Sequence, residues 1–169
     1  MHLNAKIPAM SHAHIRERPR KFLVVVDKSQ ECHVAVRFAT RRAQATGGRV
    51  TLLCSAQPAN VQQWRGVEEI MKDEARQEAE SLIYAAAKVV NELSGIVCEL
   101  VIRDDGRPID CLLELIKSDR DISILVLAAS PSKEGPGPLV SLVASASQYP
   151  IPVTIVPGAL GDDAIDALA

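Results

Sequence analysis

Polar and glycine residues follow two apolar runs of the sequence, where they could contact a ligand. Asp27 follows the run FLVVV at residues 22–26, and the segment 128–138 follows the run ISILVL at residues 122–127. A carboxylate accepts hydrogen bonds, and glycines allow backbone N–H groups to approach an anion. Asp27 could equally cap the helix that follows it, because a carboxylate is favoured at a helix N-terminus. Both roles of Asp27 stay open on the sequence alone.

The segment 128–138 has the sequence AASPSKEGPGP and admits two interpretations. In the first, Gly135 and Gly137 present N–H groups to a phosphate that Lys133 also faces. In the second, which we favour, the segment is a rigid surface turn without a ligand. The prolines beside the glycines have no N–H to donate, and the spacing differs from that of a P-loop.

Other reactive side chains lack the spacing that catalysis requires. Asp104 and Asp105 stand directly before a glycine, a pattern typical of a solvated turn, and no third acid is placed beside them. Cys32 and His33 are adjacent, so on a helix they point about 100° apart and make a poor nucleophile pair. We therefore expect no enzymatic activity beyond, at most, slow ATP hydrolysis.

The cysteines predict neither a metal site nor disulfides. The four are Cys32, Cys54, Cys98 and Cys111. None lies in a C-x-x-C pair, and none has a histidine at metal-ligand spacing. Because we see no secretory signal, we expect reduced thiols in a cytoplasmic protein. Cys54 lies in an apolar run and is predicted to be buried and inert.

Composition excludes several classes of partner. The chain has 169 residues, of which 47% are hydrophobic and 3% aromatic, and its formal net charge is −2. The few aromatic residues argue against a stacking platform for single-stranded nucleic acid, and the charge argues against a general basic field. No apolar stretch approaches the roughly 18 residues of a membrane span. We therefore expect neither nucleic acid nor a membrane as a partner.

The hydrophobic pattern predicts alternating strands and helices. Short apolar runs predict strands at residues 22–26, 50–54, 97–102, 122–127 and 153–156. Between them, apolar residues at three- and four-residue steps predict helices at residues 30–46, 61–93, 108–118 and 139–148. Ser29 is a plausible N-cap for the first helix. Alternation of this kind indicates an α/β fold with a parallel sheet and helices on both faces.

A single domain accounts for most of the chain. We place it at residues 21–157, after a flexible N-terminal tail at residues 1–20. Residues 158–169 contain the sequence DDAIDALA and form a tail or a short helix. In parallel sheets of this kind, ligands bind outside the carboxyl ends of the strands, at a switch point in the strand order. Asp27 and the segment 128–138 are both candidates for that place.

The assembled pattern resembles the universal stress protein family. The resemblance rests on FLVVVDKS near the start, GRPIDCLLEL after the third strand, and ILVLAAS and PIPVTIV near the end. It implies a Rossmann-like fold with a five-stranded parallel sheet of order 3-2-1-4-5. It also implies a dimer formed by the last strand of each subunit. Many members of this family bind ATP or AMP, and others do not.

The family's nucleotide-binding pattern is broken in this sequence. ATP-binding members carry G-x2-G-x9-G-[S/T] after the fourth strand. Ala128 stands at the first glycine, Pro131 at the second, and Val140-Ser141 near the closing pair. The resemblance implies that Asp27 contacts the adenosine moiety, that Leu127 flanks the base, and that Ser55 replaces a small apolar residue. The candidate nucleotide-binding residues are Asp27, Ser55, Leu127, Ala128, Ser130, Gly135, Gly137, Val140 and Ser141.

The last predicted strand favours a homodimer independently of the family. An exposed apolar edge strand invites aggregation, and pairing with an identical strand removes that edge. Val153 and Ile155 are the residues that we expect at the interface. A change of either residue to lysine should weaken dimerisation.

Two main functional hypotheses follow. The first is a cytoplasmic regulatory or binding module with a degenerate nucleotide-binding loop, which acts in the stress response through protein partners. The alternative is a member that binds ATP or AMP, with Mg²⁺, through Asp27 and the loop at residues 128–141. An enzyme that uses the same crevice on another small ligand is a weaker third hypothesis, because no catalytic constellation supports it.

Overall fold

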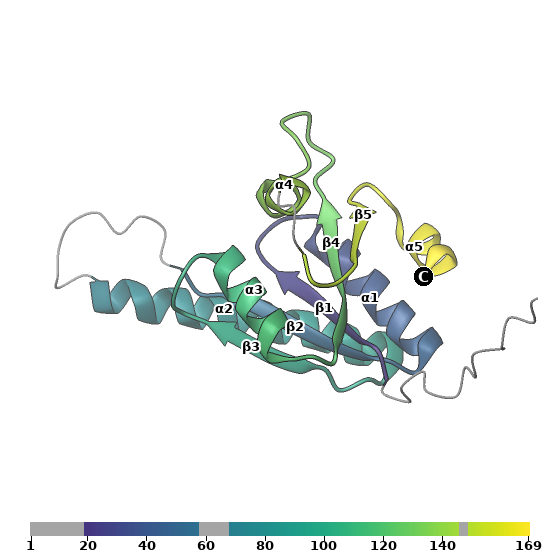
Figure 1. Cartoon of the computed structure of the whole chain (residues 1–169), viewed down its shortest axis with the longest axis horizontal. Coiled ribbons are helices and arrows are strands. Elements are labelled where there is room, and N and C mark those ends of the chain that lie inside the picture. The colour runs from purple at the N-terminus through teal and green to yellow at the C-terminus, as the bar shows by residue number, and fades with distance from the viewer. Residues whose placement is uncertain (1–18, 58–67, 146–148) are drawn as a thin grey trace, which may run out of the picture.

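The described residues form one five-stranded parallel sheet. The computed structural model describes residues 19–57, 68–145 and 149–169 (Figure 1). The strands are β1 (Lys21–Val26), β2 (Arg49–Ser55), β3 (Glu99–Arg103), β4 (Ile122–Ala129) and β5 (Val153–Pro157). Their order in the sheet is β3-β2-β1-β4-β5, and each neighbouring pair is parallel. The predicted sheet and its strand order are therefore confirmed.

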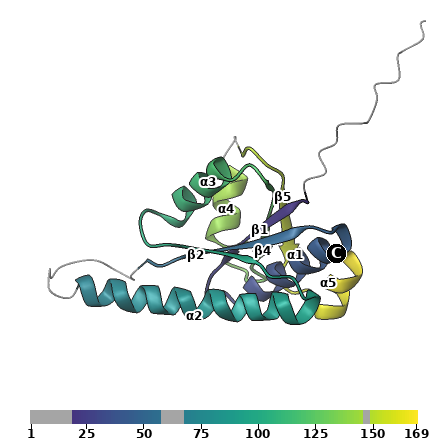
Figure 2. The same cartoon turned by 90° about the horizontal axis from the view of Figure 1, so that it is seen from below.

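Helices cover both faces of this sheet. The helices are α1 (Cys32–Thr46), α2 (Glu68–Ser94), α3 (Pro108–Ser118), α4 (Pro138–Ser145) and α5 (Asp162–Leu168). Figures 1 and 2 show α1, α2 and α5 on one face and α3 and α4 on the other. None of the helices in the described ranges combines the length and the apolar composition needed to cross a membrane.

Each strand supplies side chains to two apolar layers. Val24 and Val26 of β1 pack with α1 and α2, whereas Leu23 packs with α3 and α4, and all three are almost fully buried. Successive side chains of a strand point to opposite faces, so a strand covered on both sides must be apolar throughout. This requirement explains the continuous apolar runs of the sequence.

Several element boundaries differ from the prediction. β3 begins at Glu99 rather than at Val97, whose side chain is 88% exposed. Val97 is apolar but does not pack in the core, so its residue type alone does not indicate that it belongs to the strand. Residues 61–67 of the predicted second helix, residues 146–148 of the predicted fourth helix and the tail at residues 1–18 lie outside the described residues. The C-terminal residues form α5, whose Ile165 is fully buried.

The strand order creates a switch point beside β1. β1 pairs with β2 on one side and with β4 on the other, so the chain winds away from β1 in opposite directions. Val26 pairs with Cys54 of β2, and Val24 pairs with Val126 of β4. The segments that follow these strands therefore leave the same edge of the sheet. Ligands bind at such an edge in open α/β sheets.

Candidate ligand-binding site

A cavity of about 510 Å³ lies at the carboxyl ends of β1 and β2. We call it the main cavity. Its apolar walls come from three helices and are formed by Ala75, Ala79, Leu82, Ile109, Leu139 and Leu142. Ligand sites are commonly apolar clefts of about 300–1,000 Å³ with a few polar groups. The main cavity has both the size and the lining of such a site.

Asp27 is at the rim of the main cavity and organises the turn after β1. Its Oδ1 atom accepts hydrogen bonds from the Ser29 backbone N–H at 2.9 Å and from the Ser29 hydroxyl at 2.5 Å. This local turn engages the Ser29 side chain, and Glu31 is the N-cap residue of α1 instead. The prediction of Ser29 as the N-cap was wrong for this reason. Asp27 Oδ2 takes part in neither bond.

Ser55 contributes a buried polar atom without a partner to the same region. Ser55 lines the main cavity, and its hydroxyl oxygen has no hydrogen-bond partner among the described residues. Arg103 pairs with Ser55 in the sheet from β3, and its buried Nε atom also lacks a hydrogen-bond partner among the described residues. Buried polar groups are nearly always paired, so an orphaned one calls for an explanation. A bound ligand with a polar edge would supply the missing partner of Ser55.

Two cations line the main cavity, and each is paired with a carboxylate. Lys28 Nζ lies 2.6 Å from Glu78 Oε1 of α2, and both side chains are more than half exposed. Arg107 donates to both carboxylate oxygens of Asp110, at 2.7 and 3.1 Å. These bonds hold the pKa of the Asp110 carboxyl below its usual range. The cavity therefore carries positive as well as negative groups at its surface.

A second, much smaller hollow lies between the end of β1 and the start of α4. We call it the side pocket; its volume is about 60 Å³. Its lining includes the carboxylates of Asp27 and Glu31 and no lysine or arginine among the described residues. Gly158 allows Glu31 to pack closely at this place, since a Cβ atom on Gly158 would come within 2.7 Å of the Glu31 Cβ. The side pocket is narrow and negatively charged.

The segment between β4 and α4 uses most of its backbone donors internally. Hydrogen bonds within the segment use the backbone N–H groups of four residues, namely Ser130, Ser132, Glu134 and Gly135. Their acceptors are the carbonyl oxygens of Pro136 and Ser132 and the hydroxyl oxygens of Ser130 and Ser132. The prolines of the segment have no N–H. Few donors therefore remain for an anion.

The predicted site residues fall into three groups. Asp27 lines both the main cavity and the side pocket, and Ser55 lines the main cavity. The side pocket brings together Leu127, Ala128, Gly137 and Val140. Ser130, Gly135 and Ser141 line neither hollow; the Ser141 N–H donates to the Gly137 carbonyl at 3.0 Å, within the first turn of α4.

Sequence reasoning missed the contribution of α2 and of two charged residues. Ala75, Ala79 and Leu82 had the helical spacing of core residues, and only the packing of α2 shows that they also wall a cavity. Lys28 stood next to Asp27 and was signalled by that position alone. Nothing in the sequence pointed to Glu78.

The thiols near the site are poor nucleophiles. Burial raises the pKa of both Cys32 and Cys54 to about 11. The thiolate is the reactive form, so a raised pKa leaves these thiols protonated near neutral pH. The predicted burial of Cys54 is confirmed, and its low reactivity stays a prediction that the raised pKa favours. Among the described residues, no group of three or more His, Cys, Asp or Glu side chains is placed to hold a metal ion.

Solved structures share this fold at low sequence identity. UspA, a universal stress protein from Lactobacillus plantarum, is 20% identical with a TM-score of 0.68, over 82% of this chain and 98% of that chain. A universal stress protein from Archaeoglobus fulgidus in complex with dAMP is 19% identical with a TM-score of 0.59, over 82% and 98%. A universal stress protein in complex with cAMP is 21% identical with a TM-score of 0.53, over 84% and 99%.

Comparison of sequences identifies the family itself. A search of curated proteins found no match to the chain. The sequence model of the universal stress protein family, in contrast, matches residues 19–157, which include all five strands. This match covers most of the chain, and the shared fold agrees with it. The chain therefore belongs to the universal stress protein family.

Proposed function

We propose that this universal stress protein is a regulatory binding module that takes an adenine nucleoside or its monophosphate in the main cavity. The observation that carries the proposal is the cavity of about 510 Å³ at the switch point, beside which the buried Ser55 hydroxyl has no partner within residues 19–57, 68–145 and 149–169. A purine is flat, with faces that suit apolar walls and an edge that can form hydrogen bonds with Ser55. Asp27 Oδ2 would accept a hydrogen bond from a ribose hydroxyl.

The known complexes support this class of ligand. Two proteins of the same fold and family are described as complexes with dAMP and with cAMP. Both ligands are adenine nucleotides with a single phosphate. Because the identities are low, these complexes suggest the ligand class and not the contacts that this chain makes.

A triphosphate does not suit the β4–α4 segment. The side pocket measures about 60 Å³ and is lined by two carboxylates, which would repel a polyphosphate. Within the β4–α4 segment itself, the N–H groups of Ser130, Ser132, Glu134 and Gly135 are already engaged. We therefore retain the hypothesis of a degenerate loop and place the base and the ribose, rather than a phosphate chain, at the centre of recognition.

Binding of this kind fits a regulatory role in the stress response. In our proposal, ligand occupancy changes the surface around the cavity mouth and thereby the contacts with cytoplasmic protein partners. Walls from α2, α3 and α4 line the cavity, so a ligand there touches several elements that a partner can reach. No chemical step is required of the protein in this role.

Calorimetric titration with adenosine, AMP and Mg²⁺·ATP tests the proposal. We expect saturable 1:1 binding of adenosine and AMP, with ATP binding no more tightly than AMP. Asp27→Ala should weaken binding by roughly 1–3 kcal/mol through loss of a charged hydrogen bond. Glu114→Ala removes an exposed carboxylate of α3 and is the matched control. If the folded protein gives no heat with any of the three ligands, the nucleotide proposal is wrong and a partner-binding module without a ligand remains.

Ser55→Ala provides a second test with an unusual signature. The Ser55 hydroxyl has no hydrogen-bond partner among the described residues, so its removal should leave the free energy of unfolding unchanged or slightly raised. Ligand affinity should fall by about 0.5–1.5 kcal/mol, the usual contribution of one hydrogen bond. Chemical denaturation and titration of the same variant measure the two effects. Equal affinity for the variant and the natural protein would remove Ser55 from the site.

A further inference from the structure

We propose that Lys28 holds the ligand phosphate at the mouth of the main cavity, in exchange for its ion pair with Glu78. The inference rests on the proposed function and identifies the side chain through which this site would distinguish a nucleoside monophosphate from a nucleoside. It moves the phosphate away from the β4–α4 segment, where the family's glycine pattern would have placed it.

The charged side chains are distributed unequally around the two hollows. The side pocket is lined by the carboxylates of Asp27 and Glu31 and, among the described residues, by no cation. Lys28 and Arg107 both line the main cavity instead. A phosphate group in the side pocket would face two carboxylates and no cation, whereas at the main cavity Lys28 and Arg107 stand beside the carboxylates of Asp27 and Glu78.

Lys28 is well placed to reach the phosphate of a ligand whose ribose contacts Asp27. Lys28 follows Asp27 directly in the turn after β1, and both residues line the main cavity. A ligand whose ribose contacts Asp27 therefore brings its 5′ substituent close to the neighbouring residue. The four-carbon stem of lysine lets the ammonium group follow a phosphate over several ångströms.

The present partner of Lys28 can be replaced at little cost. The ion pair with Glu78 is 2.6 Å long, and the two side chains are 67% and 51% exposed. Exposed ion pairs of this kind contribute little to stability. A phosphate monoester carries up to two negative charges and several acceptor oxygens, so it competes well with a single carboxylate. Arg107 is less available, because Asp110 already engages its guanidinium through two hydrogen bonds.

The inference predicts a preference that depends on one cation. AMP should bind the natural protein about fivefold more tightly than adenosine, as expected of one partly exposed charge-assisted bond. Lys28→Met should abolish that preference, because the affinity for AMP falls to that for adenosine. Glu78→Gln should increase AMP affinity, because it frees Lys28 from its competing partner. Added salt should weaken AMP binding more than adenosine binding.

Calorimetric titration with adenosine and AMP tests whether the preference for AMP depends on Lys28. The proteins titrated are the natural protein, Lys28→Met, Glu78→Gln and Lys133→Met. Lys133 is the cation of the β4–α4 segment and serves as the matched control. Loss of the AMP preference in Lys28→Met alone supports the inference. An unaltered preference in Lys28→Met, or a loss in Lys133→Met alone, overturns it and leaves the proposed function standing as long as adenosine binds. If neither ligand binds the natural protein, the proposed function and the inference fail together.

Discussion

At the scale of single residues, Lys21 shows how a buried charge is held at the amino edge of the sheet. Its Nζ atom donates to Glu99 at 2.7 Å and to Asp119 at 2.5 Å, and its side chain is 8% exposed. Burial alone would lower the pKa of Lys21, but the two carboxylates raise it above its ordinary value. The charge therefore stays on the buried ammonium group and joins β1 to β3 and to the end of α3.

Replacement of Lys21 should destabilise the fold. Lys21→Met leaves two carboxylates without their shared partner, and we expect the free energy of unfolding to fall by about 1.5–3 kcal/mol. Urea denaturation measures the change. Arg49→Met removes an exposed cation from the residue that pairs with Lys21 in the sheet, and it should change stability by less than about 0.5 kcal/mol. Equal losses in the two variants would contradict a specific role for Lys21.

The same contact predicts how stability depends on pH. Burial alone would raise the pKa of Asp119, but hydrogen bonds from Lys21 and from the backbone N–H of Asp121 hold it below its usual range. An acid with a lowered pKa in the folded state adds stability at neutral pH and loses that contribution in acid. Stability should therefore decline as the pH falls below about 4, the ordinary pKa of an aspartate. The decline should be shallower in Lys21→Met, and parallel pH profiles would refute this explanation.

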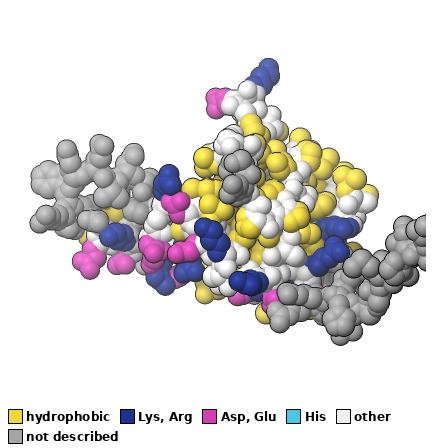
Figure 3. All heavy atoms as spheres, in the orientation of Figure 1, with side chains coloured by type: hydrophobic (Ala, Val, Ile, Leu, Met, Phe, Trp, Pro, Cys, Tyr) yellow, Lys and Arg dark blue, Asp and Glu magenta, His cyan; other side chains and the backbone are white. Residues whose placement is uncertain are grey.

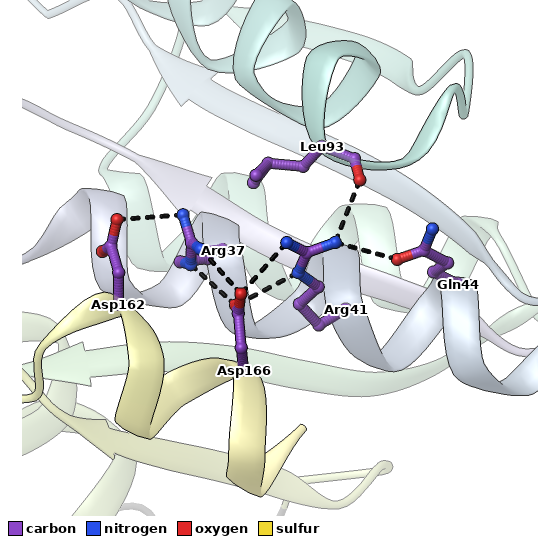
Figure 4. A network of polar contacts seen from close by, with 6 residues as sticks. All are labelled: Arg37, Arg41, Gln44, Leu93, Asp162 and Asp166. Carbon is purple, nitrogen blue, oxygen red and sulfur yellow. Dashed lines mark hydrogen bonds and ion pairs between the residues drawn. The ribbon is translucent and has the colours of Figure 1, made fainter.

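At the scale of elements, α5 is attached to the domain by one buried side chain and a charged network. Ile165 is fully buried in the layer formed with α1 and α2. Arg37 and Arg41 of α1 each donate two hydrogen bonds to Asp166, over distances of 2.7 to 3.1 Å (Figure 4). These bonds hold the pKa of the Asp166 carboxyl well below its usual range. Arg41 also donates to the Leu93 carbonyl at the end of α2, so the network joins three helices.

Loss of the Asp166 charge should loosen α5 without unfolding the sheet. In Asp166→Asn the two guanidinium groups lose their common carboxylate, and we expect the amides of Ile165 and Ala169 to exchange hydrogen faster. Amides of β1 should retain their protection. Hydrogen exchange followed by mass spectrometry measures both. Asp163→Asn makes the same change of charge at an exposed position of α5, and an effect as large as that of Asp166→Asn would refute the network as the cause.

At the scale of the whole molecule, β5 presents an edge that is unpaired among the described residues. It pairs with β4 on one side only, and its Ile155 side chain is 44% exposed. Figure 3 shows hydrophobic side chains gathered over the half of the view that contains α4, β4 and β5, whereas charged side chains are more frequent toward the half that contains α2 and α3. An exposed apolar edge of this kind favours association with a second copy. The homodimer through Val153 and Ile155 thus stays a prediction with a physical basis.

A single lysine at this edge should separate the dimer. Ile155→Lys places a charge on the exposed edge, and we expect light scattering to report a monomer at concentrations where the natural protein is a dimer. Ile70→Lys is the matched control, because Ile70 is 60% exposed on α2, away from β5. A dimer mass that survives Ile155→Lys would exclude this interface, and dissociation in Ile70→Lys alone would move the interface to α2.

The order of elements and the class of fold follow from local patterns in the sequence. Continuous apolar runs such as FLVVV specify strands buried on both faces, and their alternation with amphipathic segments leaves a parallel sheet as the natural arrangement. Asp27 and Ser55 could be nominated because they follow such runs and matched family positions. These signals are local, so they can be read along the chain without knowledge of distant contacts.

Which side chains meet depends on contacts between segments that lie far apart in the chain. Lys21 and Asp119 are 98 residues apart, and Arg37 and Asp166 are 129 residues apart, with no periodic pattern that links either pair. Similarly, only the packing of α2 against one face of the sheet brings Glu78 to Lys28 and completes the wall of the main cavity. Local sequence patterns reflect the conformation of each segment, whereas such contacts depend on how segments stack in space. Water can solvate a charged surface residue at many positions, so the sequence does not indicate its partner. The pairing becomes visible only in the folded chain.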